Sequence, residues 1–499
     1  MSRSNLSHNA LRVLYRLKDA GYQAFLVGGC VRDVMIGRHP KDFDVATNAL
    51  PDEVRSLFRN CRLVGRRFRL AHVIFGREVI EVATFRAASA PSPSDEPADE
   101  PQLDEEEVPL DEEASLDEDD EPLEELEPDD AQEQAGPARG EAASFARSEP
   151  GRGGGLEGVD HERVLDTHGR LLRDNVYGDI EEDVWRRDFT ANALYYNIAD
   201  FSLWDFVGGA EDIAARRLRL IGDPETRYRE DPVRMLRAAR FEAKLDFVLE
   251  PDTEAPIGQL KGLLSGVPPA RLFDETQKLF LTGHGERSLA VLRKHALLGV
   301  LFPAVERYLS EHPGGLVEQL LREGLRNTDA RVMAGKPVAP TFLIALLLYG
   351  PIAALIESLP PQRWHEPGVI VGACERSLRE AGARVSIPRR IALGVREMYA
   401  LQPRLEQPRG RRSLRLLEQP RFRAAFDLLS LRSQLGLASP QIAQWWTQLQ
   451  ELGAEQRIER IDALTAGAGP EPRTSAAAPA PGSGARRPRR RRRRRSTGP

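Results

Sequence analysis

The stretch Leu26–Phe58 reads LVGGCVRDVMIGRHPKDFDVATNALPDEVRSLF, and its pattern decides the fold of the chain. The apolar residues Ala24–Val27 predict a short strand, after which Gly28 and Gly29 turn the chain into a helix. A second strand is expected at Phe43–Ala46. The order of strand, glycine turn, helix and strand indicates an α/β domain.

The neighbouring segments extend this domain. An amphipathic pattern predicts a helix at Asn5–Ala20, and a proline opens a further helix at Pro51–Phe58. The segments Ala71–Phe75 and Glu78–Phe85 alternate in polarity on either side of Gly76, which predicts a hairpin. We therefore expect a mixed sheet.

The rest of the chain changes character twice. The segment Ala87–Asp160 is rich in Pro, Glu, Asp, Ala and Gly and almost lacks aromatic residues, so we predict a disordered insertion. The α/β domain resumes at Arg163–Leu220, with a helix expected from Arg186 and a strand at Leu203–Val207. From Pro224–Asp462 the pattern is almost wholly helical, and the Ala/Pro/Gly/Arg tail after it is again predicted to be disordered.

Charge is distributed unevenly along the chain. The formal net charge is −6, yet the segment between Arg86 and Arg139 holds 22 Asp and Glu residues and no Lys or Arg. Outside this block the chain is basic, and it ends in RRPRRRRRRR at Arg486–Arg495. This asymmetry suggests a polyanionic partner such as RNA.

The sequence favours a cytoplasmic protein without a membrane span. The N-terminus has no uninterrupted apolar stretch or cleavage site typical of a secretory signal. Cys30, Cys61 and Cys374 are widely spaced and fit neither a disulfide framework nor a zinc site. The charge-free segment Val338–Ile356 contains Gly-Pro and is interpreted as buried helix.

The triplet Asp42-Phe43-Asp44 is the main candidate for catalysis. On a strand, residues i and i+2 point the same way, so the two carboxylates can bridge two Mg²⁺ ions that hold an attacking 3′-oxygen and a leaving pyrophosphate. Gly28 and Gly29 would expose amide groups to a triphosphate. Two solvated acids on an edge strand and a simple glycine turn are the alternatives.

Two runs carry a resemblance to a known family. The run Leu26–Phe58 is similar to the opening motif of class II nucleotidyltransferases, the bacterial poly(A) polymerases and CCA-adding enzymes of the polymerase-β-like superfamily. The run RRDFTANALYY at Arg186–Tyr196 resembles their second motif. The resemblance implies catalytic carboxylates at Asp42, Asp44 and Asp188, two Mg²⁺ ions at Asp42 and Asp44, ATP as substrate, and nucleotide-binding residues Gly28, Gly29, Arg32, Asp33, Arg187 and Asn192. We expect Asp188 and Asn192 to share one helical face, because they are spaced i, i+4.

A third run, ETRYREDPVRMLRAARF, resembles the base-reading motif of the family. The resemblance implies that Glu230, Asp231 and Arg234 read the base. Asp accepts from an exocyclic amine and Arg donates to the adjacent ring nitrogen, an edge that adenine and cytosine share. An intrahelical ion pair is the alternative. Arg237 and Arg240 continue the same face and are candidates for triphosphate or RNA contacts.

Two further polar residues lie in the predicted hairpin. Glu81 points away from an apolar face and is either a further metal ligand or a solvated residue, so we rank Asp188 above it. His72 is interpreted as a packed histidine, because a two-metal reaction does not require a catalytic base.

Three further runs resemble the poly(A) polymerase branch of the family. They are FRNCRLVGRRFRLAHVIFG, DNVYGDIEEDVWRRDF and LLEQPRFRAAFDLL. We therefore predict an enzyme that adds AMP to RNA 3′ ends; CCA addition and a catalytically inactive RNA-binding protein are the alternatives. The insertion departs from the family pattern, so its role is not carried over. The expected parts are a nucleotidyltransferase head at 1–86 and 163–222, an insertion at 87–162, a helical neck at 223–285, a helical body and tail at 286–463 that bind RNA, and an arginine-rich tail at 464–499.

Overall fold

The computed structural model describes residues 6–65, 69–87, 163–165, 171–174, 176–408 and 410–467. Apart from their first residues, the predicted insertion at 87–162 and the arginine-rich tail lie outside these residues. The described residues form two compact units. The first is drawn from Met1–Cys30, His39–Arg186 and Tyr195–Leu203, and the second from Val31–Arg38, Arg187–Leu194 and Trp204 onward.

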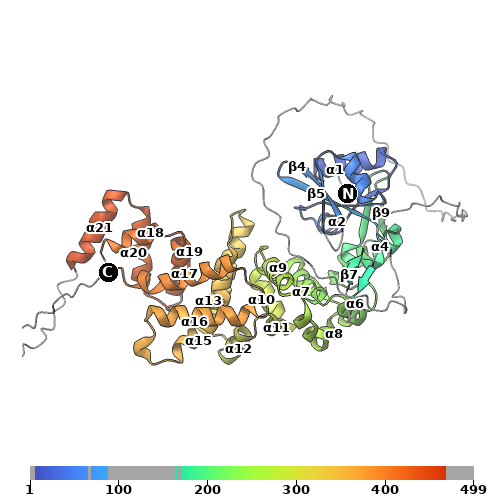
Figure 1. Cartoon of the computed structure of the whole chain (residues 1–499). Coiled ribbons are helices and arrows are strands. Elements are labelled where there is room, and N and C mark those ends of the chain that lie inside the picture. The colour runs from blue at the N-terminus through green and yellow to red at the C-terminus, as the bar shows by residue number, and fades with distance from the viewer. Residues whose placement is uncertain are drawn as a thin grey trace, which may run out of the picture. The chain divides into compact units, whose positions relative to one another are not determined.

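Figure 1 labels the elements along the chain. The strands are β1 Ala24–Val27, β2 Asp44–Thr47, β3 Cys61–Val64, β4 Leu70–Phe75, β5 Glu78–Thr84, β6 Arg163–Leu165, β7 Leu171–Asp174, β8 Leu194–Asn197, β9 Leu203–Asp205, β10 Arg217–Leu218 and β11 Val248–Leu249. The first helices are α1 His8–Asp19, α2 Gly29–Met35, α3 Pro51–Leu57, α4 Ile180–Arg186, α5 Gly209–Ala214, α6 Pro224–Glu230, α7 Val233–Leu245, α8 Pro251–Leu260, α9 Pro269–Phe280 and α10 Gly285–Lys294. The later helices are α11 Leu298–Leu301, α12 Pro303–Glu311, α13 Leu316–Met333, α14 Pro340–Leu347, α15 Tyr349–Glu357, α16 Pro367–Gly382, α17 Arg389–Glu406, α18 Arg412–Leu417, α19 Phe422–Gln434, α20 Pro440–Glu451 and α21 Ala454–Gly467.

The central sheet is mixed, as predicted. Its seven strands run in the order β3-β4-β5-β2-β1-β8-β9, with β1 antiparallel to β2 and β2 parallel to β5. The helices α1 and α3 pack against it. On β5, Ile80 and Val82 are buried, whereas Glu81 is partly exposed on the opposite face. The sheet thus has an apolar face and a face that carries polar side chains.

Several predicted elements are confirmed and others need correction. The strand Ala24–Val27 and the hairpin around Gly76 are present, but β3 and β8 were not predicted. The helix expected from Arg186 is wrong, because α4 ends there and a 3₁₀ turn, Thr190–Asn192, follows. The reason is tertiary: Phe189 is fully buried and its backbone is extended, so it forms a bridge with Leu220.

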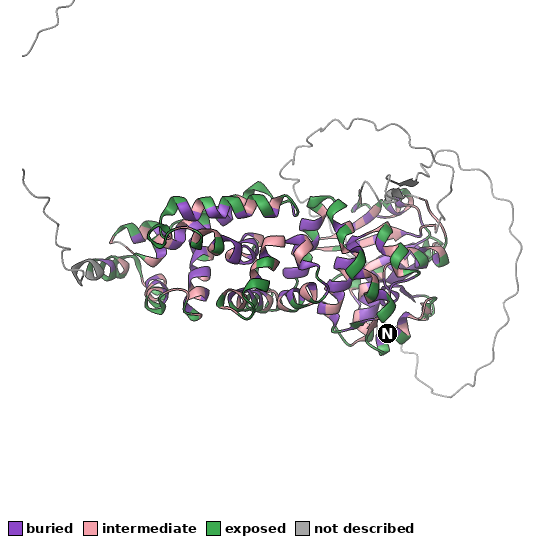
Figure 2. Ribbon diagram, turned by 90° about the horizontal axis from the view of Figure 1, so that it is seen from below, coloured by how far each residue is buried: buried purple, intermediate pink, exposed green. Residues whose placement is uncertain are grey.

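The second unit is mainly helical from α6 onward, as predicted, although the short strand β11 interrupts it and α21 runs beyond the expected end at residue 463. Figure 2 shows buried positions along one side of many of these helices and exposed positions along the other. Within the described residues no single helix is long and apolar enough to cross a membrane. The helices α14 and α15 meet both requirements only when taken together, and they are bent by 43° relative to each other. Residues Leu343–Leu347 of α14 are buried, as the sequence indicated.

Candidate active site

Gly28 directly follows β1 and brings the backbone next to a carboxylate. Its φ is +79°, a conformation that side-chain-bearing residues rarely adopt. A Cβ atom at this position would lie 3.5 Å from Asp44 Oδ2. Asp44 is the register partner of Val27, the last residue of β1, and Gly29 begins α2. The glycine turn and the carboxylate therefore lie side by side in the folded chain.

Asp42 lies just before β2, which corrects the prediction that both acids are on a strand. The strand begins at Asp44, because β1 ends at Val27 and offers no partner further back. Burial still alternates, with Asp42 exposed, Phe43 buried, and Asp44 partly exposed. This alternation is typical of an extended backbone, in which the two carboxylates share a side.

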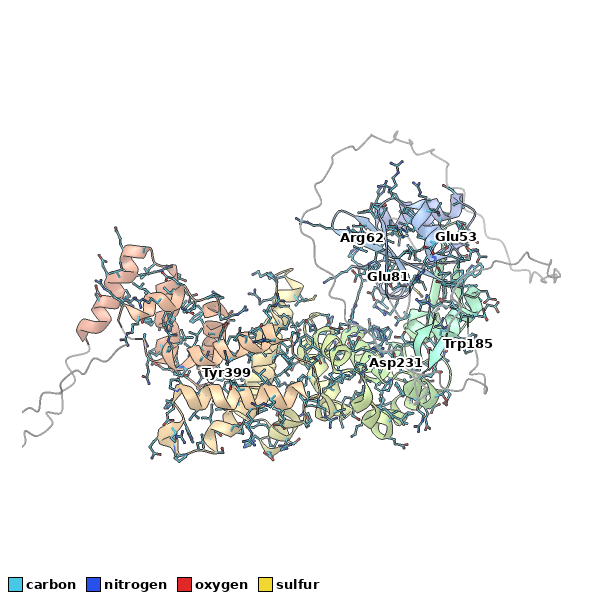
Figure 3. The ribbon with its side chains drawn as sticks, in the orientation of Figure 1. Glu53, Arg62, Glu81, Trp185, Asp231 and Tyr399 are labelled. Atoms are coloured by element: carbon cyan, nitrogen blue, oxygen red, sulfur yellow. The ribbon has the colours of Figure 1, made fainter. Side chains whose placement is uncertain are left out.

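A row of polar residues crosses the sheet from Asp44. In register, Asp44 pairs with Glu81 of β5, Glu81 with His72 of β4, and His72 with Arg62 of β3. Register partners in a sheet lie on the same face. His72 Nε2 lies 3.5 Å from Glu81 Oε2, and Figure 3 labels Glu81 and Arg62 in this sheet. Glu81 is thus a stronger candidate for a third carboxylate than its sequence alone indicated.

Asp188 is held by an arginine in the second unit. Its Oδ2 accepts from Arg237 Nε at 2.7 Å and from the same guanidinium's Nη2, while Oδ1 accepts from Phe189 N at 2.8 Å and Asn192 Nδ2 at 3.3 Å. Burial raises the pKa of Asp188, but the charge and hydrogen bonds of Arg237 outweigh it and hold the pKa far below its usual range. Asp188 and Asn192 meet, although not on a helix as predicted.

Arg32 extends this network to α2. Its side chain is 2% exposed. It donates through Nη1 to Asn192 Oδ1, and through Nε and Nη2 to Asp33 Oδ1 at 2.9 and 2.6 Å. The hydrogen bonds therefore run from Asp33 through Arg32 and Asn192 to Asp188. This chain of contacts fixes the guanidinium in one orientation.

Three arginines surround the ring of Phe241 on α7. The guanidinium carbons of Arg32, Arg237 and Arg240 lie 5.4, 5.5 and 4.6 Å from the ring centroid. Burial and the nearby Arg237 lower the pKa of Arg240. Its Nε has no hydrogen-bond partner among the described residues, and the Oε2 atom of Glu275 is 3.8 Å away. Burial among like charges disfavours the charged form of Arg240, and a bound anion would stabilise it.

The expected base-reading residues lie at the junction of α6 and α7. Arg234 Nη1 donates to Glu230 Oε2 at 3.0 Å and to the carbonyl oxygen of Arg227 at 2.7 Å, and Arg227 Nη1 donates to Glu230 Oε2 at 2.7 Å. A further bond joins Arg227 Nη2 to the carbonyl oxygen of Arg187 at 2.7 Å. Glu230 therefore orients two arginines rather than facing a base by itself.

Arg271 is a site residue that the sequence analysis missed. Its Nη1 and Nη2 donate to Asp231 Oδ1 and Oδ2 at 2.9 and 2.7 Å, in a two-pronged ion pair. Asp231 is followed by Pro232 at the start of α7, whereas Arg271 lies 40 residues away on α9. No local pattern connects the two, so only the folded chain reveals this pair.

The predicted site residues thus fall into two groups, one in each unit. Gly28, Asp42 and Asp44 belong to the first unit, together with Glu81. The second unit holds the arginine-rich group and the base-reading residues. These are Arg32, Asp33, Arg187, Asp188, Asn192, Glu230, Asp231, Arg234, Arg237 and Arg240.

The mixed sheet with its paired carboxylates, followed by helices, defines a nucleotidyltransferase. Family models match the chain at three places: the poly A polymerase head domain at residues 24–135 and 137–219, the probable RNA and SrmB- binding site of polymerase A at 246–309, and the polymerase A arginine-rich C-terminus at 365–496. Poly(A) polymerase I of Salmonella typhi is 41% identical over 475 residues, which cover 94% of this chain and 88% of that enzyme. The corresponding protein of Haemophilus influenzae is 39% identical, with 92% and 88% covered. The chain belongs to the poly(A) polymerase family and is a template-independent adenylyltransferase.

The CCA-adding enzymes are more distant relatives. That of Bacillus subtilis is 32% identical over 56% of this chain and 51% of its own length. The crystal structure of the Bacillus stearothermophilus CCA-adding enzyme in complex with CTP has a TM-score of 0.51 at 22% identity, covering 91% of this chain and 82% of that one. This likeness shows the shared fold. The comparisons therefore favour the predicted adenylate addition over the CCA-adding alternative.

Proposed function

We propose that Asp42 and Asp44 hold the two magnesium ions of adenylate addition, next to an ATP whose phosphates lie against the Gly28 turn. The observation that carries this proposal is the short approach of Gly28 to Asp44, 3.5 Å from a built Cβ to Oδ2. A side chain at this turn would occupy space beside the carboxylate. Glycine leaves this space to a phosphate and exposes backbone amides to it.

The carboxylates at this site fit magnesium better than a metal that is bound by protein ligands alone. No group of three or more His, Cys, Asp or Glu side chains that could hold a metal is found among the described residues. Mg²⁺ is commonly bound by one or two carboxylates together with waters and substrate phosphates. Asp44 and Glu81, side by side on β2 and β5, offer such a partial set. When bound, Mg²⁺ would offset phosphate charge and make the 3′-hydroxyl a better nucleophile.

The arginines around Phe241 are proposed as a further contact for nucleotide phosphate, within the second unit. Arg32 is fixed by Asp33 and Asn192, and Arg237 by Asp188, so two guanidiniums keep their orientation before a ligand arrives. The Nε–H group of Arg240 donates to no described residue and can therefore donate to a ligand. Preoriented cations stabilise the charge that develops on a leaving pyrophosphate without reorganising during the reaction. In this proposal Asp188 positions Arg237.

Base recognition is assigned to Asp231 and Arg234. The two-pronged contact with Arg271 orients Asp231, and a carboxylate has lone pairs left for an exocyclic amine. Glu230 fixes Arg234, whose remaining donors can reach a ring nitrogen. We therefore infer that Glu230 and Arg271 are positioning residues for the pair that contacts the base.

We infer that the second substrate is the 3′ end of RNA, because the relatives reported above are poly(A) polymerases. We infer a role in the polyadenylation and turnover of messenger and other RNAs in the cytoplasm, where ATP and RNA are both present. Support comes from the match at residues 246–309 to a model described as a probable RNA-binding site.

The test of the metal site is Asp44→Ala, with Asp52→Ala as the matched control. Asp52 is an exposed acid on α3, 74% accessible. We expect Asp44→Ala to lower incorporation of labelled AMP by at least about a thousandfold, equivalent to about 4 kcal/mol. RNA affinity, measured without nucleotide, should stay nearly unchanged. Full-rate tailing by Asp44→Ala would remove these carboxylates from the mechanism.

The nucleotide used is tested separately. Labelled ATP and CTP are offered singly to a generic oligonucleotide and to a tRNA that lacks its terminal CCA. We expect long products from ATP on both RNAs and little incorporation from CTP. Addition of CTP confined to the truncated tRNA would instead favour the CCA-adding alternative.

A further inference from the structure

An open groove runs along the contact between α16 and α17. These helices pack against each other, and the groove encloses 680 Å³. Its lining comes from both helices at helical spacing, so one face of each contributes. The lining residues are Glu375, Leu378, Arg379, Arg389, Ala392, Leu393 and Arg396.

The charge of this groove is strongly positive. Three arginines and one acid line it, and the acid, Glu375, accepts from Arg396 Nη1 at 3.0 Å. Arg379 and Arg389 are exposed, and neither forms an ion pair or side-chain hydrogen bond with any residue that the structure describes. Between them lies an apolar strip that includes Leu393, which is 45% exposed. The groove thus combines two available cations with an apolar floor.

The surroundings add to the positive charge. Arg376 on α16, Arg384 in the turn after it and Arg390 on α17 are also exposed and form no ion pair within the described ranges. On α13 two of the exposed arginines behave differently: Arg322 pairs with Glu286 at 2.8 Å, and Arg326 with Glu323 at 2.7 Å. Among the described residues, exposed arginines without an ion pair are therefore more numerous on α16, α17 and the turn between them than on α13, and such charge attracts a polyanion.

We propose that the α16–α17 groove binds the sugar-phosphate backbone of single-stranded RNA, with Arg379 and Arg389 on phosphates and Leu393 beneath a sugar or base. This proposal rests on the proposed function, because RNA is the polyanion that the enzyme elongates. The groove lies outside residues 246–309, the segment that matches the probable RNA-binding model, and would be a second contact with the same strand. Basic walls over an apolar floor suit a single strand, which presents phosphates and unstacked bases together.

The experiment compares the full chain with the double variant Arg379→Gln/Arg389→Gln. Affinity for an unstructured oligoribonucleotide is measured over a salt series, without nucleotide and with a chelator, so that the result does not depend on catalysis. We expect an affinity loss of at least about fivefold near 0.1 M salt and a salt slope reduced by about 1.4, since each single-strand phosphate contact contributes about 0.7. In tailing assays KM for RNA should rise, while kcat and KM for ATP stay the same.

Two control variants separate a phosphate contact from a structural effect. Arg379→Lys/Arg389→Lys keeps the charge and should retain most of the affinity. Arg322→Gln/Arg326→Gln removes the same charge from α13 and should leave RNA affinity unchanged. Equal affinity of the groove variant and the parent would overturn the proposal, as would an equal loss in the α13 variant. Polyglutamate binding that is lost in the groove variant, while RNA affinity stays unchanged, would assign the groove to an acidic peptide instead.

Parent enzyme that binds RNA through the groove but incorporates no AMP would refute the proposed function and leave the groove assignment standing. Normal tailing by the parent, together with unchanged RNA affinity of the groove variant, would refute the groove assignment and leave the proposed function standing.

Discussion

The arginines around Phe241 and those of the α16–α17 groove are two solutions to binding anions. Around Phe241, Arg32 and Arg237 are held by Asp33, Asn192 and Asp188 within hydrogen-bonding distance. In the groove, Arg379 and Arg389 are exposed and unpaired with described residues. Held cations fix the geometry of a small ligand, and their contribution resists salt. Exposed cations adapt to a long strand, and salt screens them. Substitutions should therefore affect chemistry in the first region and RNA affinity in the second.

The largest effect is expected from Arg237→Ala. Removing the arginine leaves the mostly buried carboxylate of Asp188 without its cation, which should lower the free energy of unfolding by about 2 to 3 kcal/mol. Tailing should fall strongly even under conditions where the variant is folded, because a triphosphate contact is lost. Denaturant unfolding and single-turnover AMP incorporation measure the two effects. Unchanged incorporation would show that the region around Phe241 does not contact ATP.

The same variant has a predicted pH signature. Arg237 holds the pKa of Asp188 well below its unfolded value, so the ion pair stabilises the fold fully above about pH 4, the usual pKa of an aspartate. This stability is lost as the pH falls towards the folded pKa. The difference in unfolding free energy between parent and Arg237→Ala should therefore be constant near neutrality and shrink in acid. A difference independent of pH down to acid would contradict the ion-pair explanation.

An intermediate effect is expected from Arg234→Ala, whose side chain is 13% exposed. The loss of a hydrogen-bond donor to the base should raise KM for ATP by about 10- to 100-fold, or about 1 to 3 kcal/mol, and loosen the choice of nucleotide. Rates with ATP, CTP and GTP give the selectivity. Arg229→Ala is the control, since this neighbour on α6 is paired only with Glu225 and is 55% exposed. Selectivity identical to that of the parent would exclude Arg234 from base reading.

The smallest effect is expected from deleting Ala90 to Gln134, and it concerns exposed arginines alone. This stretch carries all 22 acidic residues between Arg86 and Arg139 and lies outside the described residues. A tethered polyanion competes with RNA for the exposed cations of the groove and for the nine arginines at Arg486–Arg495. We expect the deletion to tighten RNA binding severalfold at low salt and hardly at high salt. Equal affinities at low salt would identify the block as a spacer.

Local patterns predicted much of the fold. The strand at Ala24–Val27 and the hairpin around Gly76 were both predicted and are both present, because alternation and glycine turns depend on neighbours in the chain. The helix expected from Arg186 failed because burial of Phe189 outweighed the i, i+4 pattern. The sequence pattern predicted Asp42 on a strand, but β2 begins two residues later, at Asp44, where its pairing with β1 starts.

The sequence by itself determined the family and the glycine turn that precedes Asp42 and Asp44, and it predicts the residues of the base-reading motif. These depend on short stretches whose chemistry and spacing are visible in the chain. The tertiary structure alone placed Glu81 beside Asp44, Arg237 on Asp188, and Arg271 on Asp231. Each of these pairs joins residues that are at least 37 positions apart in the numbering and lie on different elements. Such contacts follow from sheet register and helix packing, because these bring together side chains that no local period relates.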